Sequence, residues 1–317
     1  MALIGECLIE LNGTPFGALS QTFGGDTLNT ALYLARLAAR AADVQYVTAL
    51  GTDVLSDGML QRWQAEGIDT TLTLRDPARR PGLYLIQVDA RGERTFLYWR
   101  GESAARYLLQ HAGYGHVAAQ LAEADVIYLS GISLAILPVE DRAKLLGELQ
   151  RFASRGTAII FDTNYRPALW PSMESARAAS SSLLPATRLL FVTYDDEQRL
   201  WGDRSPEDTL TRLHAAKAAF VVVKLGAAGC LISDGATLTK VAATPVAKVT
   251  DTTAAGDAFN AGYMAAWLDD RSPEDCCRAA NALAGAVIQH RGAIIPAGAT
   301  PSLAQLLPDR SRADLAL

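Results

Sequence analysis

Short apolar runs alternate with longer segments of helical periodicity, and this alternation most constrains the fold of the chain. The predicted strands are the apolar runs at 2–8, 44–50, 126–130, 158–161, 189–192 and 220–224. The predicted helices lie between or beside them, at 29–37, 58–66, 139–155, 174–184 and 206–217. Strands that are apolar on both faces and separated by helices indicate a mostly parallel sheet with helices on both sides, a three-layer αβα arrangement.

One stretch departs from this rhythm. Residues 82–88 and 94–99 are rich in β-formers and flank the turn 89–93, so they predict a hairpin rather than a βαβ unit. Such a hairpin can be a lid that keeps water from a site, and a decorative edge hairpin has the same pattern. No internal repeat or linker interrupts the chain. We therefore expect one domain over residues 1–317 with a small β appendage.

Composition excludes several classes of protein. The 317 residues carry a net charge of −5, which argues against a nucleic-acid partner. No uncharged apolar run reaches the roughly 18 residues that cross a bilayer, so no membrane partner is expected. The start of the chain carries Glu6 and Glu10 and does not resemble a signal peptide. The four cysteines include no C-x-x-C pair, which suits buried thiols and a cytoplasmic location: Cys7, Cys230, Cys276 and Cys277.

The sharpest motif is Asp251–Phe259, which precedes an apolar helical run. Its small residues Ala254, Ala255 and Gly256 would let backbone N–H groups approach an anion at a helix N-terminus. A carboxylate beside that anion, Asp257, could accept a proton from a hydroxyl during phosphoryl transfer. The plainer interpretation is that Asp251 or Asp257 only caps the helix.

A second glycine segment lies near the N-terminus. Gly24 and Gly25 precede Asp26 and Asn29 at the start of another predicted helix. The glycines permit close approach to a ligand, and the two polar side chains can bond hydroxyl groups. An ordinary glycine turn followed by a helix-capping residue would have the same sequence. Later in the chain, Lys224–Gly229 follows an apolar strand and suits either phosphate groups or any tight turn.

Taken together, the two motifs resemble those of the ribokinase-like (PfkB-type) carbohydrate kinases. Asp251–Phe259 fills the C-terminal motif of that family, and the residues that fill the N-terminal motif are Gly24, Gly25, Asn29, Ala31, Ala35, Arg36 and Leu37. The resemblance implies a ribokinase-like fold, a β lid from about 10–23 and 82–100, and ATP and Mg²⁺ as cofactors. It implies Asp257 as catalytic base and residues 254–256 as the anion hole. The family usually has glycine at position 254, so the alanine here questions the local backbone geometry.

The resemblance also implies a nucleotide site, formed by Asn164, Arg166, Lys224, Gly226, Gly229, Gly256 and Asn281. Metal ligands stay unassigned, because the usual Asn-x-x-Glu motif corresponds to Thr193–Asp196 here. A monovalent cation such as K⁺ occurs in the family near the position of Asp251 and Thr253. Lids in the family often pair between subunits, which implies a homo-oligomer.

Within the family, this sequence most resembles the kinases that phosphorylate the 6-hydroxyl of 2-keto-3-deoxygluconate. The implied contacts to this sugar acid are Gly25, Asp26, Asn29, Tyr84, Tyr98, Arg100, Arg166 and Asp257, with Arg166 holding the carboxylate. A fructokinase or ribokinase acting on a neutral sugar is the alternative within the family. A non-catalytic sugar- or nucleotide-binding regulator on the same fold is the alternative outside catalysis.

Overall fold

The computed structural model describes residues 1–38, 41–88 and 94–307, so the predicted turn at 89–93 lies outside the described residues. Among them, nine strands form one large sheet in the order β13-β12-β11-β10-β9-β8-β1-β4-β5. The seven strands from β11 to β5 are mutually parallel, and β12 and β13 extend the sheet antiparallel. The strands are β1 (Ala2–Ile4), β4 (Gln45–Leu50), β5 (Thr73–Arg75), β8 (Val126–Ser130), β9 (Ala158–Asp162), β10 (Thr187–Thr193), β11 (Val221–Lys224), β12 (Cys230–Ser233) and β13 (Leu238–Val241).

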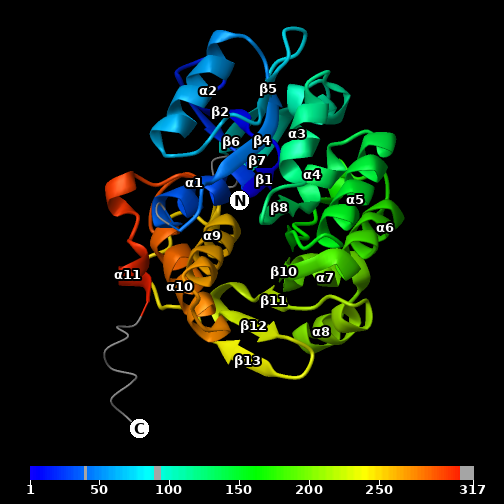
Figure 1. Ribbon diagram of the computed structural model, residues 1–317. Helices are drawn as coiled ribbons and strands as arrows, with labels where there is room; N and C mark the ends of the chain where they lie inside the picture. The colour runs from blue at the N-terminus through cyan, green and yellow to red at the C-terminus, as the bar shows by residue number, and fades with distance from the viewer. Residues whose placement is uncertain (39–40, 89–93, 308–317) are drawn as a thin grey trace.

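Helices cover both faces of this sheet, as Figure 1 shows. One layer contains α1 (Asp26–Ala38), α2 (Val54–Ala65), α9 (Ala255–Leu268) and α10 (Pro273–Val287). The other contains α3 (Tyr114–Leu121), α5 (Val139–Ala153), α6 (Met173–Leu183), α7 (Tyr194–Trp201) and α8 (Pro206–Ala215). The short helices α4 (Gly131–Ala135) and α11 (Leu303–Leu306) complete the α-helices of the described part, which also contains short 3-10 helices. The predicted three-layer architecture is confirmed.

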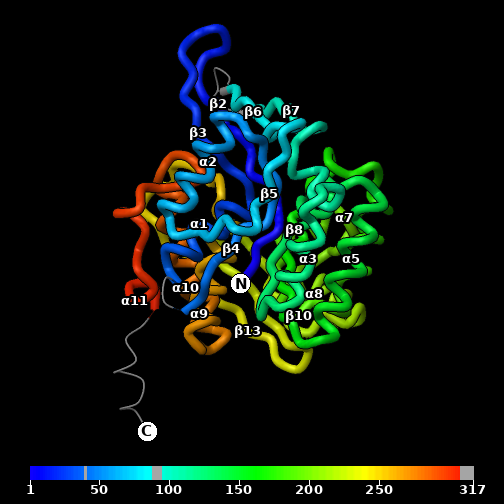
Figure 2. The backbone as a smooth tube through the Cα atoms, turned by 45° about the horizontal axis from the view of Figure 1, so that its top comes forward, coloured from blue at the N-terminus to red at the C-terminus, as the bar shows by residue number. Residues whose placement is uncertain are grey.

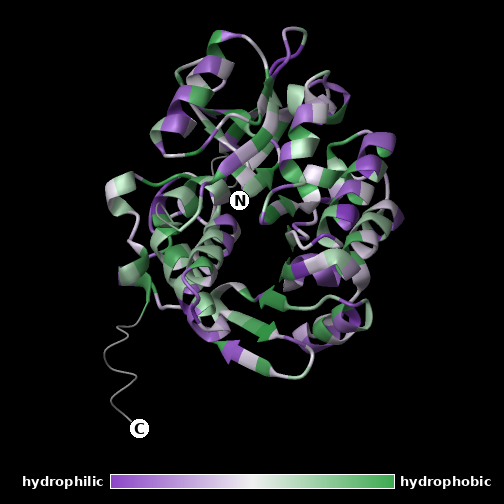
Figure 3. Ribbon diagram, in the orientation of Figure 1, coloured by the Kyte–Doolittle hydropathy of each residue, from purple (hydrophilic) through white to green (hydrophobic). Residues whose placement is uncertain are grey.

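Side-chain alternation along the strands creates a core on each side of the sheet. Leu3 of β1 packs into the core beneath α1 and α9, whereas Ala2 and Ile4 pack into the opposite core. Successive side chains of a strand point to opposite faces, so a strand covered on both sides must be apolar throughout. Figure 3 shows strands such as β11 and β12 mainly green, whereas helices such as α2 and α8 mix green with purple. The four cysteines are buried and unpaired, as predicted.

The lid is a second, four-stranded sheet in the order β3-β2-β6-β7, which projects from the body in Figure 2. Its strands are β2 (Leu8–Gly13), β3 (Leu19–Gly24), β6 (Leu83–Val88) and β7 (Arg94–Trp99). Two antiparallel hairpins are joined through the parallel pair of β2 and β6. The hairpin predicted at 82–99 is therefore one half of the lid.

The single strand predicted over 2–8 is wrong. The chain leaves the main sheet after β1 and enters the lid as β2, with a break at residues 5–7. A Cβ atom on Gly5 would lie 2.0 Å from Oγ1 of Thr27, so helix α1 packs directly against the chain at this point. Apolar residues on both sides of Gly5 and Glu6 suggested a single strand, because β1 and the start of β2 are both buried.

Strand order places the ends of several elements close together. The chain builds outward from β1 through β4 and β5, then returns to β8 on the other side of β1 and continues in the opposite direction. In open α/β sheets, the crevice beyond the carboxyl ends at such a reversal is where ligands bind. The N-termini of α1 and α9 meet here, since Asn29 of α1 bonds Asp257 of α9. Among the described residues, no helix has the length and apolar character needed to cross a bilayer.

Candidate active site

Four of the predicted side chains meet as two hydrogen-bonded pairs. Nδ2 of Asn29 donates to Oδ2 of Asp257 at 2.8 Å, and Nδ2 of Asn164 donates to Oδ2 of Asp26 at 2.7 Å. These residues come from α9, α1 and the segment after β9. Each amide holds one carboxylate in a fixed orientation. Carboxylates held in this way can accept a proton or a hydrogen bond from a hydroxyl group.

Helix α9 begins after a residue in the left-handed region. Ala254 has φ 61° and ψ 13°, and its carbonyl accepts the N–H of Ala258 at 2.8 Å. A left-handed residue followed by right-handed ones turns successive N–H groups toward one concavity, which binds anions. The position therefore has the geometry that glycine favours, and alanine occupies it at a cost of about 1–2 kcal/mol.

The three amides predicted to form the anion hole are not equivalent. The N–H of Ala255 donates to the carbonyl of Thr252 at 3.2 Å. Within the described chain, the N–H groups of Ala254 and Gly256 have no main-chain acceptor. The turn that starts the helix thus engages one of the three predicted anion-hole amides, that of Ala255.

Asp257 has an unusual affinity for its proton. Burial and the neighbouring carboxylates of Asp26 and Asp162 raise the pKa of Asp257 to about 7, against the opposing effects of Asn29 and Lys224. A group that titrates near neutral pH is suited to general base catalysis. The capping interpretation alone gives no reason for this cluster of charge.

A buried polar network lies beneath Asp257. Nζ of Lys224 donates to Oδ2 of Asp162 at 2.9 Å and to Oδ1 of Asn260 at 3.3 Å. Nδ2 of Asn260 donates to the same Asp162 oxygen at 2.6 Å and to the hydroxyl of Tyr128 at 3.0 Å. Nζ of Lys224 also lies 3.6 Å from the position that a Cβ of Gly256 would take. Lys224 therefore places its charge directly behind the amide concavity.

The sequence analysis assigned no functional role to Asp162 or Asn260. Asp162 was visible only as the first polar residue after an apolar strand, and Asn260 interrupts the apolar face of the helix that follows the C-terminal motif. Both are buried, with exposures of 3% and 0%. A polar residue within an otherwise buried pattern is the signal that could have identified them.

The lid strands carry Tyr84 and Tyr98, where the sequence placed them, and also Glu10, while Glu6 lies in the break before β2; the sequence analysis gave neither glutamate a role in the site. The Tyr84 hydroxyl donates to Oε2 of buried Glu10, and the Tyr84 and Tyr98 rings lie 5.7 Å apart. Arg100 donates from Nε to Oε2 of buried Glu6 at 2.8 Å. Acidic residues within apolar strands were the available signal, since buried carboxylates need partners.

Arg166 lies on the body side of the cleft. Its side chain is 51% exposed and donates to Oδ2 of Asp196 at 3.1 Å. Burial raises the pKa of Tyr98 of the lid, while the positive charges of Arg100 and Arg166 oppose that shift. Both arginines therefore act on the same lid tyrosine, and each one already carries a carboxylate partner.

The glycines of the N-terminal motif make close approaches to the protein itself. A Cβ on Gly25 would lie 2.2 Å from the carbonyl oxygen of Glu6, and one on Gly24 would lie 2.7 Å from the Tyr84 hydroxyl. The sequence analysis attributed these glycines to approach by a ligand. The junction between lid and body is sufficient to require both.

Apart from Arg166, whose contact with Asp196 is given above, the predicted nucleotide residues fall into two groups. Lys224, Asn164 and Gly256 belong to the cluster around Asp257, as described above. Gly226 (φ +57°) and Gly229 (φ +90°) form the turn between β11 and β12. Nδ2 of Asn281 donates to the Ala242 carbonyl at 3.1 Å, beside β12 and β13. No contact among the described residues joins this second group to Asp257.

A preformed cage for a metal ion is absent from the described part of the chain, where no three or more potential ligands gather. Mg²⁺ typically binds one or two carboxylates together with substrate phosphates, so this finding fits a metal that arrives with a nucleotide. Asp196 is a partly buried carboxylate at this edge, and burial raises its pKa against the effect of Arg166. Asp251 accepts N–H groups from Thr253 at 3.0 Å and Gly292 at 2.8 Å, which fixes the loop before α9.

Several known proteins are similar to this chain over most of its length. The model of the pfkB family of carbohydrate kinases matches residues 1–299. A 2-dehydro-3-deoxygluconokinase of Haemophilus influenzae is 53% identical over 298 residues, which are 93% of this chain and 95% of that protein. The Escherichia coli K12 protein of the same name is 49% identical over 307 residues, 95% of this chain and 99% of that one. A solved fructokinase from Xylella fastidiosa with bound ATP superposes with a TM-score of 0.81 at 23% identity, covering 96% of each chain.

Proposed function

Because this chain belongs to the pfkB family of carbohydrate kinases, we propose that it transfers the γ-phosphoryl group of ATP to the 6-hydroxyl of 2-keto-3-deoxygluconate. This sugar acid is also written 2-dehydro-3-deoxygluconate, the form in the names of the similar proteins. The products are the 6-phosphate and ADP. The observation that carries the proposal is the Asp257 carboxylate, clamped by Asn29 at the amide-lined end of α9.

In the proposed reaction, Asp257 takes the proton of the 6-hydroxyl as its oxygen bonds to phosphorus and the bond to the leaving ADP breaks. The N–H groups of Ala254 and Gly256 and the charge of Lys224 would stabilise the transferring phosphoryl oxygens. Mg²⁺ supplies further charge neutralisation when it is bound with ATP, and Asp196 is the carboxylate suited to hold it. The lid would exclude water, which competes with the sugar hydroxyl.

The sugar would bind between lid and body, against Gly25, Asp26, Asn29, Tyr84, Tyr98 and Arg100. Oδ1 of Asn29 is buried and has no partner among the described residues, so it can accept a sugar hydroxyl. Arg166 would hold the carboxylate of the sugar acid. A guanidinium has five N–H donors, so Arg166 can bind that carboxylate and keep its contact with Asp196.

The nucleotide would use Asn164, Arg166, Lys224, Gly226, Gly229, Gly256 and Asn281. Gly226 supports this assignment, because a Cβ there would meet no protein atom within 4 Å, whereas Gly229 is already required by the carbonyl of Val241, 2.0 Å from where its Cβ would lie. A monovalent cation such as K⁺ near Asp251 and Thr253 belongs to the proposal as well. The hydrogen-bonded loop at Asp251 would connect that cation to the start of α9.

The proposal includes a cytoplasmic homo-oligomer that pairs through the lid. Exposed large apolar side chains gather on the lid strands, with Leu97 39%, Trp99 58% and Leu19 44% exposed. Exposed large apolar side chains on both edge strands of the lid, β3 and β7, support an interface there. Neither nucleic acid nor a membrane takes part in the proposed activity.

The test is a panel of sugars in a coupled assay of ADP release. We expect turnover with 2-keto-3-deoxygluconate and little with fructose or ribose at the same concentration. Preferred turnover of a neutral ketose would replace the substrate assignment by that of a fructokinase or ribokinase. Ligand binding without turnover of any sugar would favour the non-catalytic regulator. Phosphate position in the product, read by ³¹P NMR, tests the 6-hydroxyl assignment.

A further inference from the structure

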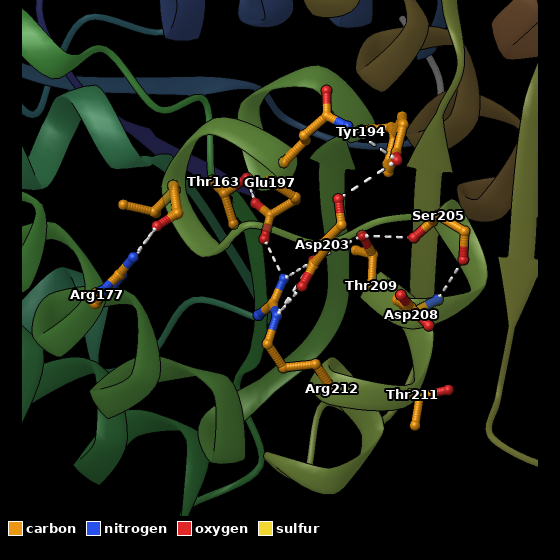
Figure 4. A network of polar contacts seen from close by, with 12 residues as sticks. Thr163, Arg177, Tyr194, Glu197, Asp203, Ser205, Asp208, Thr209, Thr211 and Arg212 are labelled. Atoms are coloured by element: carbon orange, nitrogen blue, oxygen red, sulfur yellow. Dashed lines mark hydrogen bonds and ion pairs between the residues drawn. The ribbon is translucent and has the colours of Figure 1, made fainter.

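A buried chain of polar contacts runs from the active-site segment to the far side of α7, as Figure 4 shows. Oγ1 of Thr163 donates to Oε1 of Glu197 at 2.8 Å. Nη2 of Arg212 donates to Oε2 of Glu197 at 2.7 Å and to Oδ2 of Asp203 at 2.6 Å. The chain ends where Oγ1 of Thr209 donates to the same Asp203 oxygen at 2.8 Å. It thus connects the residue after Asp162 with helix α8.

Burying the carboxylate of Glu197 costs free energy that an apolar side chain would not. Its side chain has no exposed surface, and burial raises the pKa of Glu197 against the opposing effects of Arg212 and Thr163. Removing two charges from water costs several kcal/mol per ion, and well-packed apolar residues often stabilise such a position as well or better. The buried pair of Glu197 and Arg212 is therefore not explained by stability alone. Glu197 contacts Thr163, which lies next to the proposed active-site residue Asn164.

Thr163 is fixed on every side. Its N–H donates to the Phe191 carbonyl at 3.0 Å, and a Cβ on Gly131 would lie 2.0 Å from its carbonyl oxygen. The bond to Glu197 fixes its side chain. On one side of it Asp162 holds Lys224, and on the other Asn164 holds Asp26 with a backbone φ of +30°, which few residues other than glycine adopt.

The turn of α7 that carries Glu197 also contacts the other end of the segment 162–166. Asp196, which precedes Glu197 in α7, accepts the contact from Arg166. Anchoring Glu197 through Arg212 therefore fixes both the Thr163 end and the Arg166 end of the segment 162–166. Placement of Asn164, Asp26 and Arg166 depends on one buried anchor in the second layer of helices.

We propose that Glu197 and Arg212 are positioning residues for phosphoryl transfer, acting through Thr163 on Asn164 and Asp26. This inference rests on the kinase function proposed above. A displacement of about 1 Å in a reacting group can cost about 10²-fold in rate, so a loss of the Thr163 tether should be visible in kinetics. Loss of the hydrogen bond from Thr209 to Asp203, at the other end of the network, should leave the kinetics unchanged.

The test compares two isosteric changes, Thr163→Val and Thr209→Val. Both threonines are buried, at 4% and 0% exposure, and each donates one hydrogen bond of 2.8 Å to a carboxylate of the network. We expect both variants to lose similar stability in urea unfolding. At a temperature where both are folded, Thr163→Val should lower kcat/KM about tenfold or more, with KM for sugar and ATP raised, whereas Thr209→Val should stay within about twofold.

Two further variants complete the test. Thr163→Ser keeps the hydroxyl and should recover most of the lost kcat/KM. The pair Thr163→Val with Glu197→Gln should lose no more activity than the worse single variant, because both remove the same tether. If the wild-type enzyme is active, equal losses of kcat/KM in Thr163→Val and Thr209→Val would overturn the inference. A failure of Thr163→Ser to recover kcat/KM would overturn it as well. A wild-type protein without kinase activity on any sugar would overturn the proposed function itself, and a preference for a neutral sugar would change only the sugar used in the comparison.

Discussion

Nδ2 of Asn29 donates a 2.8 Å hydrogen bond to Oδ2 of Asp257 across 228 residues of sequence. The bond joins α1 to the first turn of α9, and so joins the two motifs on which the family resemblance depends. It also stabilises the charged form of Asp257, against the burial that raises the pKa of that carboxyl group. One contact thus links the geometry of the site to its protonation.

Replacing the base should abolish most turnover without abolishing nucleotide binding. For Asp257→Asn we expect kcat to fall by about 10²–10⁴-fold, the usual contribution of a general base. ATP binding, measured by titration calorimetry, should persist. Asp141→Asn on α5 is the matched control and should keep wild-type kinetics. Near-normal turnover of Asp257→Asn would remove Asp257 from the role of base.

The activity should depend on pH through Asp257. Only the deprotonated carboxylate can accept the hydroxyl proton, so kcat/KM should rise with pH and level off above about 7. Asp26→Asn removes a neighbouring negative charge and should move the midpoint to lower pH. Asn29→Ala removes a hydrogen bond to the charged form and should move it to higher pH. Shifts of the same sign in both variants would contradict this account.

The left-handed conformation of Ala254 predicts opposite effects of glycine at two adjacent positions. Ala254→Gly should raise the free energy of unfolding by about 0.5–1 kcal/mol, since relief of steric cost exceeds the added chain entropy. Ala255→Gly should lower it by about 0.5–1 kcal/mol, because that residue is already helical. Urea unfolding measures both. A stabilising effect at 255 or a destabilising one at 254 would contradict the backbone geometry.

Arg166 should distinguish acidic from neutral sugars. Losing a charge-assisted hydrogen bond costs about 1.5–3 kcal/mol, so Arg166→Met should raise KM for the sugar acid about tenfold to a hundredfold. KM for any neutral sugar that turns over should change little. Arg177→Met on α6 is a suitable control, because that guanidinium bonds the Leu200 carbonyl instead. An equal effect on neutral sugars would assign the carboxylate contact to another residue, with Arg100 the next candidate.

Much of the fold followed from local patterns. Apolar runs and helical spacing predicted the main strands and helices, because side-chain periods of 2 and 3.6 record which faces are buried. The C-terminal motif predicted a helix start with exposed amides, since small residues and Asp are local signals. The break after β1 coincides with Gly5 and Glu6, which interrupt the apolar run, but the sequence analysis treated residues 2–8 as one strand because apolar residues continue on both sides.

The sequence alone could not predict which charged side chains pair with one another. Nothing local pairs Arg100 with Glu6, Lys224 with Asp162 or Thr163 with Glu197, since the members of these pairs are 94, 62 and 34 residues apart. The sequence by itself determined many of the strands and helices and the start of the helix after the C-terminal motif, because those depend on neighbouring residues. Only the tertiary structure decided which carboxylates and cations share a buried site, because strand order alone brings the ends of distant elements together.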